Sequence, residues 1–188
     1  IEVIADDYFG LSKGNRKLEF LRSLAAQRPV TLHGVELGPA STSPIEAKRI
    51  EAFARLRDAV KPESWSEHLA LVRAGGVEIG HLAAAPRNAE SVEGTLANLH
   101  RMERTMGSAP IMENISSLID PPLSTMSEST WMTQVLNGSN SGMLLDLHNV
   151  HVNAHNFGFD PYGYLDEIPL ERVRGIHIAG GRPIEGRI

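Results

Sequence analysis

The stretch Leu145-Asp146-Leu147-His148 is a short apolar run that ends on side chains able to bind a metal ion. Four other short runs end in the same way: Thr31-Leu32-His33, Ser66-Glu67-His68, Ile111-Met112-Glu113 and Gly175-Ile176-His177. Successive candidate ligands are 31 to 45 residues apart, close to the roughly 31 residues per unit of a barrel in which about 250 residues form eight strand-helix repeats. The spacing predicts parallel strands whose carboxyl ends bring these side chains to one rim.

Short β-type runs alternate with longer helical patterns, which predicts a parallel sheet covered by helices. We therefore expect an α/β fold, a TIM-type (β/α)8 barrel that is incomplete in this chain and has about six strand-helix units. An open doubly wound sheet is the competing architecture, but no glycine-rich phosphate loop follows the first strand. The expected strands are residues 1–5, 29–35, 64–69, 109–114, 142–149 and 172–179, and the expected helices are 15–27, 44–60, 90–106, 127–137 and 160–168.

The composition is that of an ordinary globular protein, with 188 residues of which 41% are hydrophobic and 22% charged. It predicts a single domain over residues 1–188. A formal net charge of −5 argues against nucleic acid and anionic membranes as partners. No apolar run is long enough to span a bilayer and no signal segment opens the chain, so we expect a cytoplasmic protein. The opening Ile1-Glu2-Val3-Ile4 is typical of a strand interior and nothing closes the fold at Ile188, so we expect a fragment at both ends.

The alternation of side chains along a strand predicts which residues face the barrel interior. His33 shares a face with Thr31, and His68 shares one with Ser66, whereas Glu67 points the other way and is expected to be a hydrogen-bonding group at the rim. A single histidine at a strand end is usually structural, but five agreeing strand ends favour a cation that compensates the buried charges. The predicted ligands are His33, His68, Glu113, Asp146, His148 and His177.

The remaining histidines carry weaker signals. His100 is expected on a helix surface, and His151 and His155 in a loop after the fifth strand, where either could line the pocket. Because the chain has no cysteine, a bound metal must use imidazole, carboxylate or amide groups. No nucleophile elbow or Walker loop is present, and a glycosidase pair of Glu113 and Asp146 would leave the histidines unexplained.

With these residues in view, the chain resembles the multinuclear non-haem iron-dependent oxidase family that includes the methanobactin-biosynthesis oxidase. The matches follow the family's order over nearly the whole chain. They are Leu32-His33-Gly34-Val35, Ser66-Glu67-His68-Leu69, Met112-Glu113-Asn114 followed by Ser116-Ser117, Leu144-Leu145-Asp146-Leu147-His148-Asn149-Val150, Gly158-Phe159-Asp160-Pro161 and Ile176-His177-Ile178-Ala179-Gly180.

The resemblance implies a barrel that holds two or three iron ions and uses dioxygen to act on cysteine residues of a ribosomally made precursor peptide. It also implies a separate partner protein that delivers the peptide. By position, the five strand-end residues His33, His68, Glu113, Asp146 and His177 match expected ligands. Other matching positions are assigned to the pocket or to the surroundings of the ligands, namely Glu2, Glu67, Asn114, Asn149 and His155.

The chain departs from the family pattern at several positions. His148 lies where the family usually has Asn, and Phe157 where it usually has His, although His155 is close enough to substitute. Ile115 replaces a usual Pro and Gly181 a usual His.

The family's first strand and its late Asp-x-His and Glu ligand segments have no counterpart in this chain. The Asp-x-His segment would begin near Ile188. Two alternatives therefore stay open. One is a divalent-metal barrel of the sugar-isomerase or endonuclease-IV type that uses zinc or manganese without dioxygen. The other is a non-catalytic scaffold that binds metal or peptide.

Overall fold

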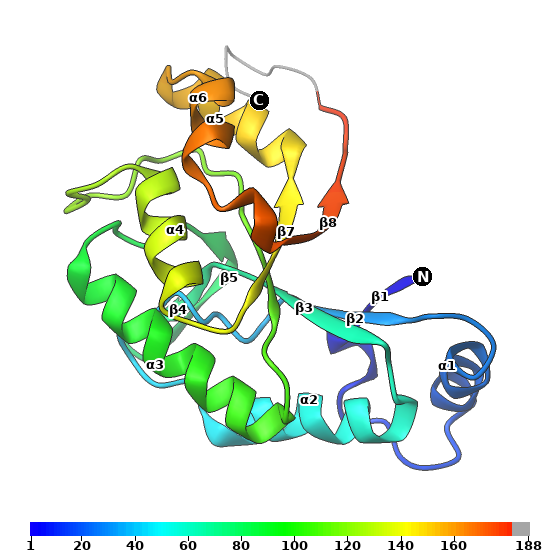
Figure 1. Ribbon diagram of the computed structural model, residues 1–188. Helices are drawn as coiled ribbons and strands as arrows, with labels where there is room; N and C mark the ends of the chain where they lie inside the picture. Colours follow the sequence, from blue (N-terminus) through cyan, green and yellow to red (C-terminus); the bar gives the residue numbers. More distant parts are fainter. Residues whose placement is uncertain (182–188) are drawn as a thin grey trace.

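The computed structural model describes residues 1–181, so the predicted end of the domain at Ile188 lies outside the described residues. Six parallel strands form one sheet in the order β1-β2-β3-β6-β7-β8. The sheet is strongly curled, and helices lie on its outer side (Figure 1). The bounds of the strands are Glu2–Ile4 (β1), Thr31–Gly34 (β2), Ser64–His68 (β3), Ile111–Glu113 (β6), Gly142–Asp146 (β7) and Val173–His177 (β8).

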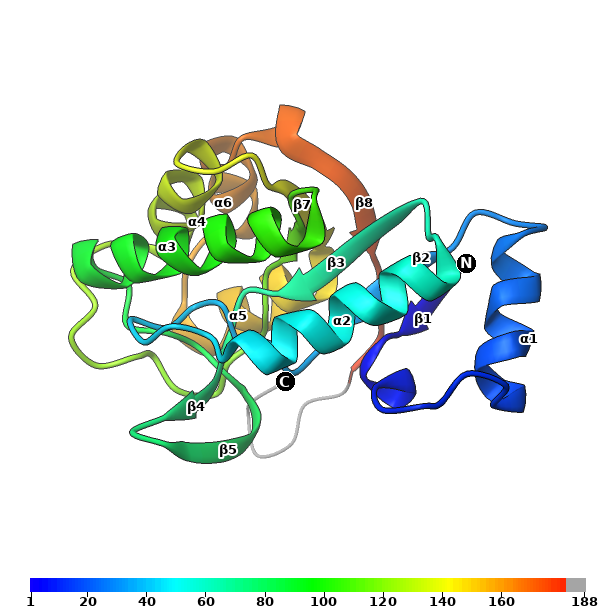
Figure 2. The same ribbon diagram turned by 90° about the horizontal axis from the view of Figure 1, so that it is seen from below.

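The strands of the sheet alternate along the chain with helices, as in a barrel of strand-helix units (Figure 2). The longest of these helices, α2 and α3, pack against each other on the outer side. Among the described residues, no helix is both long and apolar enough to cross a membrane. The helices are Arg16–Ala25 (α1), Ala47–Val60 (α2), Ala89–Met106 (α3), Glu128–Asn137 (α4), Leu147–Phe157 (α5) and Pro161–Glu167 (α6), with short 3-10 turns at Asp6–Tyr8 and Leu170–Arg172.

The hydrophobic core lies between the outer face of the sheet and the helices. Leu32, Trp65 and Met112 are at most 3% exposed and alternate along their strands with the predicted ligands. The ring of Trp65 contacts Phe53 of α2, with ring centroids 5.2 Å apart. This packing fixes the face of each strand, because a slip of one residue would exchange the apolar and polar sets.

The inner face of the sheet is polar in consecutive layers. Thr31 and Ser64 are paired in register and their hydroxyl oxygens are 2.8 Å apart, and His33 and Ser66 form the next layer. The predictions that His33 shares a face with Thr31 and that His68 shares a face with Ser66 are therefore confirmed.

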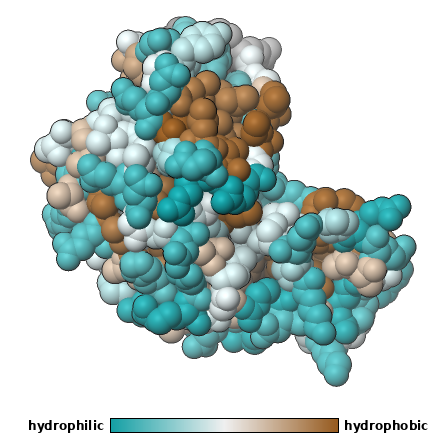
Figure 3. Space-filling view, viewed as in Figure 1, coloured by the Kyte–Doolittle hydropathy of each residue, from teal (hydrophilic) through white to brown (hydrophobic). Residues whose placement is uncertain are grey.

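The edge strand β8 has one face that no helix of the described residues covers. Ile176, which alternates with His177, is 55% exposed, and Ile178 just beyond the strand is 80% exposed. In Figure 3 an apolar patch lies over the region of β8 and α5.

The six predicted strands and five predicted helices are present, with differences at their ends. The strand expected over 142–149 ends at Asp146, because the Asp146 side chain caps a helix that begins at Leu147. This helix, α5, was not predicted, and the loop expected around His151 and His155 is wrong because both lie on it. The helix expected from residue 44 begins at Ala47.

A second difference is an antiparallel hairpin formed by β4 (Leu71–Ala74) and β5 (Val77–Ala83). Gly75 and Gly76 link its strands with φ of 57° and 80°. Positive φ at both positions is the signature of a type I′ turn, which glycine adopts without strain.

The long loop between β2 and α2 is held by one buried side chain of α3, Asn98. Its Oδ1 accepts from the Ile45 N–H at 3.0 Å, and its Nδ2 lies 3.0 to 3.2 Å from the carbonyls of Pro39, Ser41 and Ser43. Asn98 is 2% exposed, and its bonds to the Ile45 N–H and the Pro39 carbonyl are buried.

We expect Asn98→Ala to lower the free energy of unfolding by about 2 to 3 kcal/mol, because it leaves the Ile45 N–H and the Pro39 carbonyl unpaired in the interior. Urea unfolding with an unchanged m-value measures this. His100→Ala on the exposed face of the same helix should stay within about 0.5 kcal/mol of the parent. Equal effects of the two substitutions would contradict this account of the loop.

Candidate metal centre

Three side chains from three adjacent strands meet at one carboxylate oxygen. Nε2 of His33 lies 3.2 Å and Nε2 of His68 lies 3.4 Å from Oε2 of Glu113. The three ligand atoms lie within 4.8 Å of one another. Glu113 is 2% exposed, and its Oε2 has no hydrogen-bond partner among the described residues.

The hydrogen bonding of His68 fixes which of its nitrogens is free. Nδ1 lies 3.1 Å from the Gly34 carbonyl, and a carbonyl can only accept, so Nδ1 carries the proton. Burial lowers the pKa of His68, which keeps the ring neutral. Nε2 then presents a lone pair to the oxygen of Glu113. A cation bound by both atoms would stabilise this close approach of a lone pair and a carboxylate oxygen.

His33 is held in the same way by its neighbour in register. Its Nδ1 lies 2.7 Å from the Ser66 hydroxyl, which orients the ring toward Glu113. Burial, together with His68 and His177, lowers the pKa of His33 to about 3. His33 is therefore neutral at physiological pH, which is the form that binds a metal ion.

A second group of ligand atoms shares the same glutamate. Glu113, Asp146 and His177 also offer atoms within 4.8 Å of one another. Nδ1 of His177 lies 2.8 Å from Glu113 Oε1, and its Nε2 lies 3.1 Å from Oε2 of Glu2 on β1. One oxygen of Glu113 thus faces each group, so this residue is placed to bridge two ions.

The electrostatics of the shared glutamate follow from its burial. Burial raises the pKa of Glu113 to about 7, against the lowering effect of His177. Burial alone would lower the pKa of His177, but Glu113 and Glu2 raise it overall. Without a metal ion, protons shared among these groups supply part of the positive charge that the buried carboxylate requires.

Two asparagines hold Asp146 in place. Asn114 donates to the Asp146 carbonyl at 2.9 Å and accepts from its N–H at 2.8 Å. Asn149 donates its N–H to Asp146 Oδ1 at 2.8 Å and its side-chain amide to the Asn114 carbonyl at 2.9 Å. The predicted pocket residues Asn114 and Asn149 therefore position a ligand candidate.

Glu67 lies behind the site, on the outer face of the sheet. Its carboxylate accepts from the N–H groups of Leu37 and His68, and burial raises its pKa well above the usual value. An added Cβ at Gly34 would lie 2.4 Å from Glu67 Oε2, so only glycine leaves room for this carboxylate. The prediction that Glu67 faces away from the site is confirmed.

Two predicted pocket or ligand histidines do not join the two groups of ligand atoms. The strand expected over 142–149 would place His148 on the same face as Asp146, but His148 lies in the first turn of α5, where successive side chains rotate around the helix axis. Its role as a ligand stays a prediction. His155 lies near the other end of α5 and is exposed.

Asp6 supports the site although it was not among the residues predicted from the sequence. Its carboxylate accepts from the N–H groups of Val35 at 2.9 Å and Glu36 at 3.2 Å, so it fixes the backbone just after His33. The only available signal was an acidic residue shortly after the first expected strand.

Comparison with known proteins places the chain in a family. A family model described as the RiPP precursor modification enzyme MbnB/TglH/ChrH matches residues 1–187, where RiPP denotes a ribosomally synthesised and post-translationally modified peptide. The chain belongs to this family. This confirms the resemblance inferred from the sequence.

Curated relatives agree with this membership. UPF0276 proteins from Acaryochloris marina and Anaeromyxobacter sp. are each 32% identical over 180 residues, or 96% of this chain. The chain spans 64% and 63% of their respective lengths.

Solved structures confirm the barrel architecture. Endonuclease IV from Thermus thermophilus is 14% identical with a TM-score of 0.57, covering 96% of this chain and 67% of that one. A D-psicose 3-epimerase structure in the presence of D-fructose is 12% identical with a TM-score of 0.58, covering 95% of this chain and 62% of that one. At these identities the similarity establishes the fold: a TIM-type barrel, of which this chain forms a curled six-stranded part.

We expect Glu113→Gln to weaken binding of divalent metal ions by roughly 100-fold or more, because both ligand groups lose their shared carboxylate. Calorimetric titration with Mn²⁺ or anaerobic Fe²⁺ measures this. Glu63→Gln, on an exposed residue just before β3, provides the matched control and should bind as the parent does. Parent-like affinity in Glu113→Gln would rule out the shared ligand.

Metal affinity should also depend on pH with a defined sign. Since the pKa of Glu113 is raised to about 7, an ion must displace a proton below that pH. The affinity should therefore rise with pH through about pH 7, where Glu113 loses its proton; His177, whose pKa is also raised, adds to this rise, and Glu113→Gln should show a smaller one. An affinity that falls as the pH rises through this range would contradict the assignment.

Proposed function

We propose that this chain is a multinuclear iron-dependent oxidase that uses dioxygen to modify cysteine residues of a ribosomally synthesised peptide. The observation that carries the proposal is the buried Glu113, shared by two groups of ligand atoms, in a member of a family of peptide-modifying enzymes. Imidazole and carboxylate groups without thiolates are a ligand set that suits non-haem iron.

The donor set fits two ions that share one bridging residue. His33, His68 and Glu113 would hold one ion, and Glu113, Asp146 and His177 the other. The unpaired Oε2 of Glu113 and the lone pair of His68 Nε2 support this fit independently of any relative. When bound, iron would supply a place where a cysteine thiolate and dioxygen meet and exchange electrons.

The chain's own residues would keep this donor set ready for metal. Burial keeps His33 and His68 neutral, so no proton has to leave these rings before a metal binds. Ser66 and the Gly34 carbonyl orient the two rings through their second nitrogens. His177 would take up or release a proton at the solvent-facing side of the centre, where it and its partner Glu2 are partly exposed.

The proposal extends to the partners of the protein. The substrate would be a cysteine-containing precursor peptide, and a separate protein would deliver it to the rim.

A second candidate function is a divalent-metal enzyme of the sugar-isomerase or endonuclease-IV type. The shared fold favours it, since the solved structures with this architecture include an endonuclease IV and an epimerase. Such an enzyme would use zinc or manganese and would not consume dioxygen. A non-catalytic scaffold would bind metal or peptide without modifying the peptide or consuming dioxygen.

The test combines the protein, anaerobically loaded with Fe²⁺, with a short cysteine-containing precursor peptide. We expect dioxygen uptake and a mass change at the peptide's cysteines, because the two ligand groups would hold the metal next to the substrate thiolate. Mass spectrometry and an oxygen electrode measure both, and a peptide with Ser in place of Cys should remain unmodified.

Three results would refute the oxidase proposal. They are modification without dioxygen, activity supported by zinc or manganese alone, and peptide binding with neither uptake nor modification. The second result favours the second candidate function and the third favours the scaffold.

A further inference from the structure

A second cavity lies outside the candidate metal centre, between α4, α6 and the segment that joins α5 to α6. Its volume is about 300 Å³. Its walls combine aromatic rings with carboxylates, and we call it the acidic aromatic cavity. The lining residues that matter here are Phe157, Phe159 and Tyr164, the carboxylates of Asp120, Glu128, Asp160 and Glu167, and the guanidinium of Arg87.

The aromatic wall is ordered and includes an unpaired polar group. The rings of Phe159 and Tyr164 stack with centroids 6.0 Å apart and an interplanar angle of 26°. Tyr164 is 4% exposed, and its hydroxyl lies beside Glu128 without a hydrogen bond of good geometry among the described residues. Tyr164 and Glu128 both line the cavity, so this hydroxyl can also accept a hydrogen bond from a group that enters the cavity.

The carboxylates carry more negative charge than the cavity compensates. Arg87 is the one basic residue among the described residues that line it, and its guanidinium pairs with Asp120. The other acids bond to neutral donors, namely Asn153 for Glu128, the N–H groups of Tyr162 and Gly163 for Asp160, and the Ser129 hydroxyl for Glu167. Neutral donors satisfy lone pairs but do not cancel charge.

The protonation of Glu128 is consistent with this imbalance. Burial raises its pKa to about 7, and the lowering effects of Arg87 and Asn153 do not offset that rise. A cation in the cavity would favour the ionised form. Aromatic faces beside carboxylates form the environment that binds an organic cation, since the ring quadrupoles and the acids attract the same charge.

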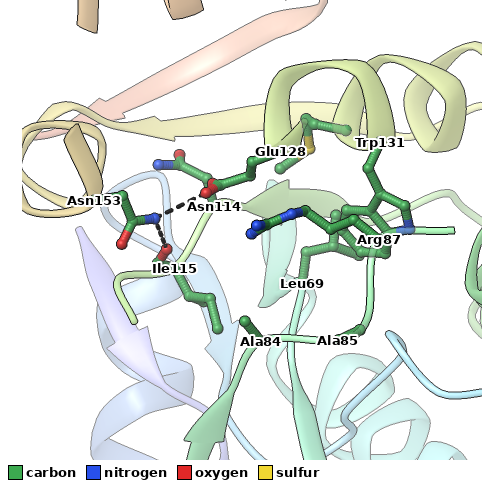
Figure 4. A pocket seen from close by; sticks show the side chains of 10 residues that line it. Leu69, Ala84, Ala85, Arg87, Asn114, Ile115, Glu128, Trp131 and Asn153 are labelled. Atoms are coloured by element: carbon green, nitrogen blue, oxygen red, sulfur yellow. Dashed lines mark hydrogen bonds between the residues drawn. The ribbon is translucent and has the colours of Figure 1, made fainter. Parts of the chain in front are cut away.

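Asn153 links Glu128, in the wall of the cavity, to the loop that follows β6. Asn153 of α5 donates to the Ile115 carbonyl and to Glu128 Oε2, both at 2.9 Å; Figure 4 shows these two bonds in a neighbouring pocket, which Asn153, Ile115 and Glu128 line. Ile115 is two residues beyond Glu113, and the loop from there to α4 also supplies Asp120. Both sites therefore lie at the end of the barrel where the strands finish and the following helices begin.

We propose that the acidic aromatic cavity binds a cationic side chain, a lysine ammonium or an arginine guanidinium, of the peptide whose cysteine reaches the metal centre. This inference rests on the proposed function for the identity of the ligand as a peptide. The cavity would fix the position of the peptide along the rim and select precursors that carry a basic residue near the modified cysteine.

The probe is a short acetylated and amidated peptide with one central lysine, titrated into the full chain and followed by NMR. We expect saturable binding of this peptide, and binding weaker by about 5- to 10-fold in Glu167→Gln, which loses charge but keeps an acceptor for Ser129. The matched control is Asp166→Asn, which removes one charge from the neighbouring exposed position of α6 and should bind as the parent does. Unchanged unfolding midpoints establish that both variants fold.

Several outcomes would overturn the inference. One is equal binding of a peptide with norleucine in place of lysine, and another is equal weakening in Asp166→Asn and Glu167→Gln. Binding of free n-butylammonium as tight as that of the lysine peptide would assign the cavity to small amines rather than to a peptide.

The failure of this inference is separable from the failure of the proposed function. Glu113→Gln should lose metal binding and retain the lysine peptide, because Glu113 does not line the cavity. Iron binding by the parent without selectivity for lysine refutes the inference alone. Selectivity for lysine without iron binding refutes the oxidase proposal alone.

Discussion

The carboxylate of Glu113 is buried at the end of a central strand, where an unpaired negative charge is costly. The fold places three imidazoles beside the two oxygens of Glu113, which offsets part of this cost. The arrangement depends on the parallel sheet, because only strands that finish at the same rim place residues from positions 33 to 177 around one group. The apolar outer face of those strands also helps to place these residues around Glu113, since it fixes which side chains point inward.

The surroundings of the site reinforce this geometry from behind. Asp6 and Glu67 hold the backbone that follows β2, and Asn114 and Asn149 hold the turn that follows β7. These carboxylates and amides act on backbone groups, so they set the positions of His33 and Asp146 without entering the pocket. A site supported in this way keeps its shape before a metal arrives, which lowers the cost of binding.

The sequence predicted the barrel class and the five strand-end residues that the structure brings to one rim. Spacing and side-chain alternation were sufficient because both follow from regular strand geometry. The extent of α5 was not predicted, because Leu147-His148-Asn149-Val150 continues the alternation of the strand, and only the capping bond from Asn149 to Asp146 ends it. The role of Asp6 and the acidic aromatic cavity depend on contacts between loops distant in sequence, which local patterns do not encode.

The most direct measurement of the shared ligand is anomalous diffraction at the iron edge from crystals loaded with Fe²⁺ without oxygen. The account predicts two peaks that flank Glu113, one beside His33 and His68 and the other beside Asp146 and His177. A single peak that leaves Glu113 outside its coordination sphere, or peaks only at surface carboxylates, would contradict it.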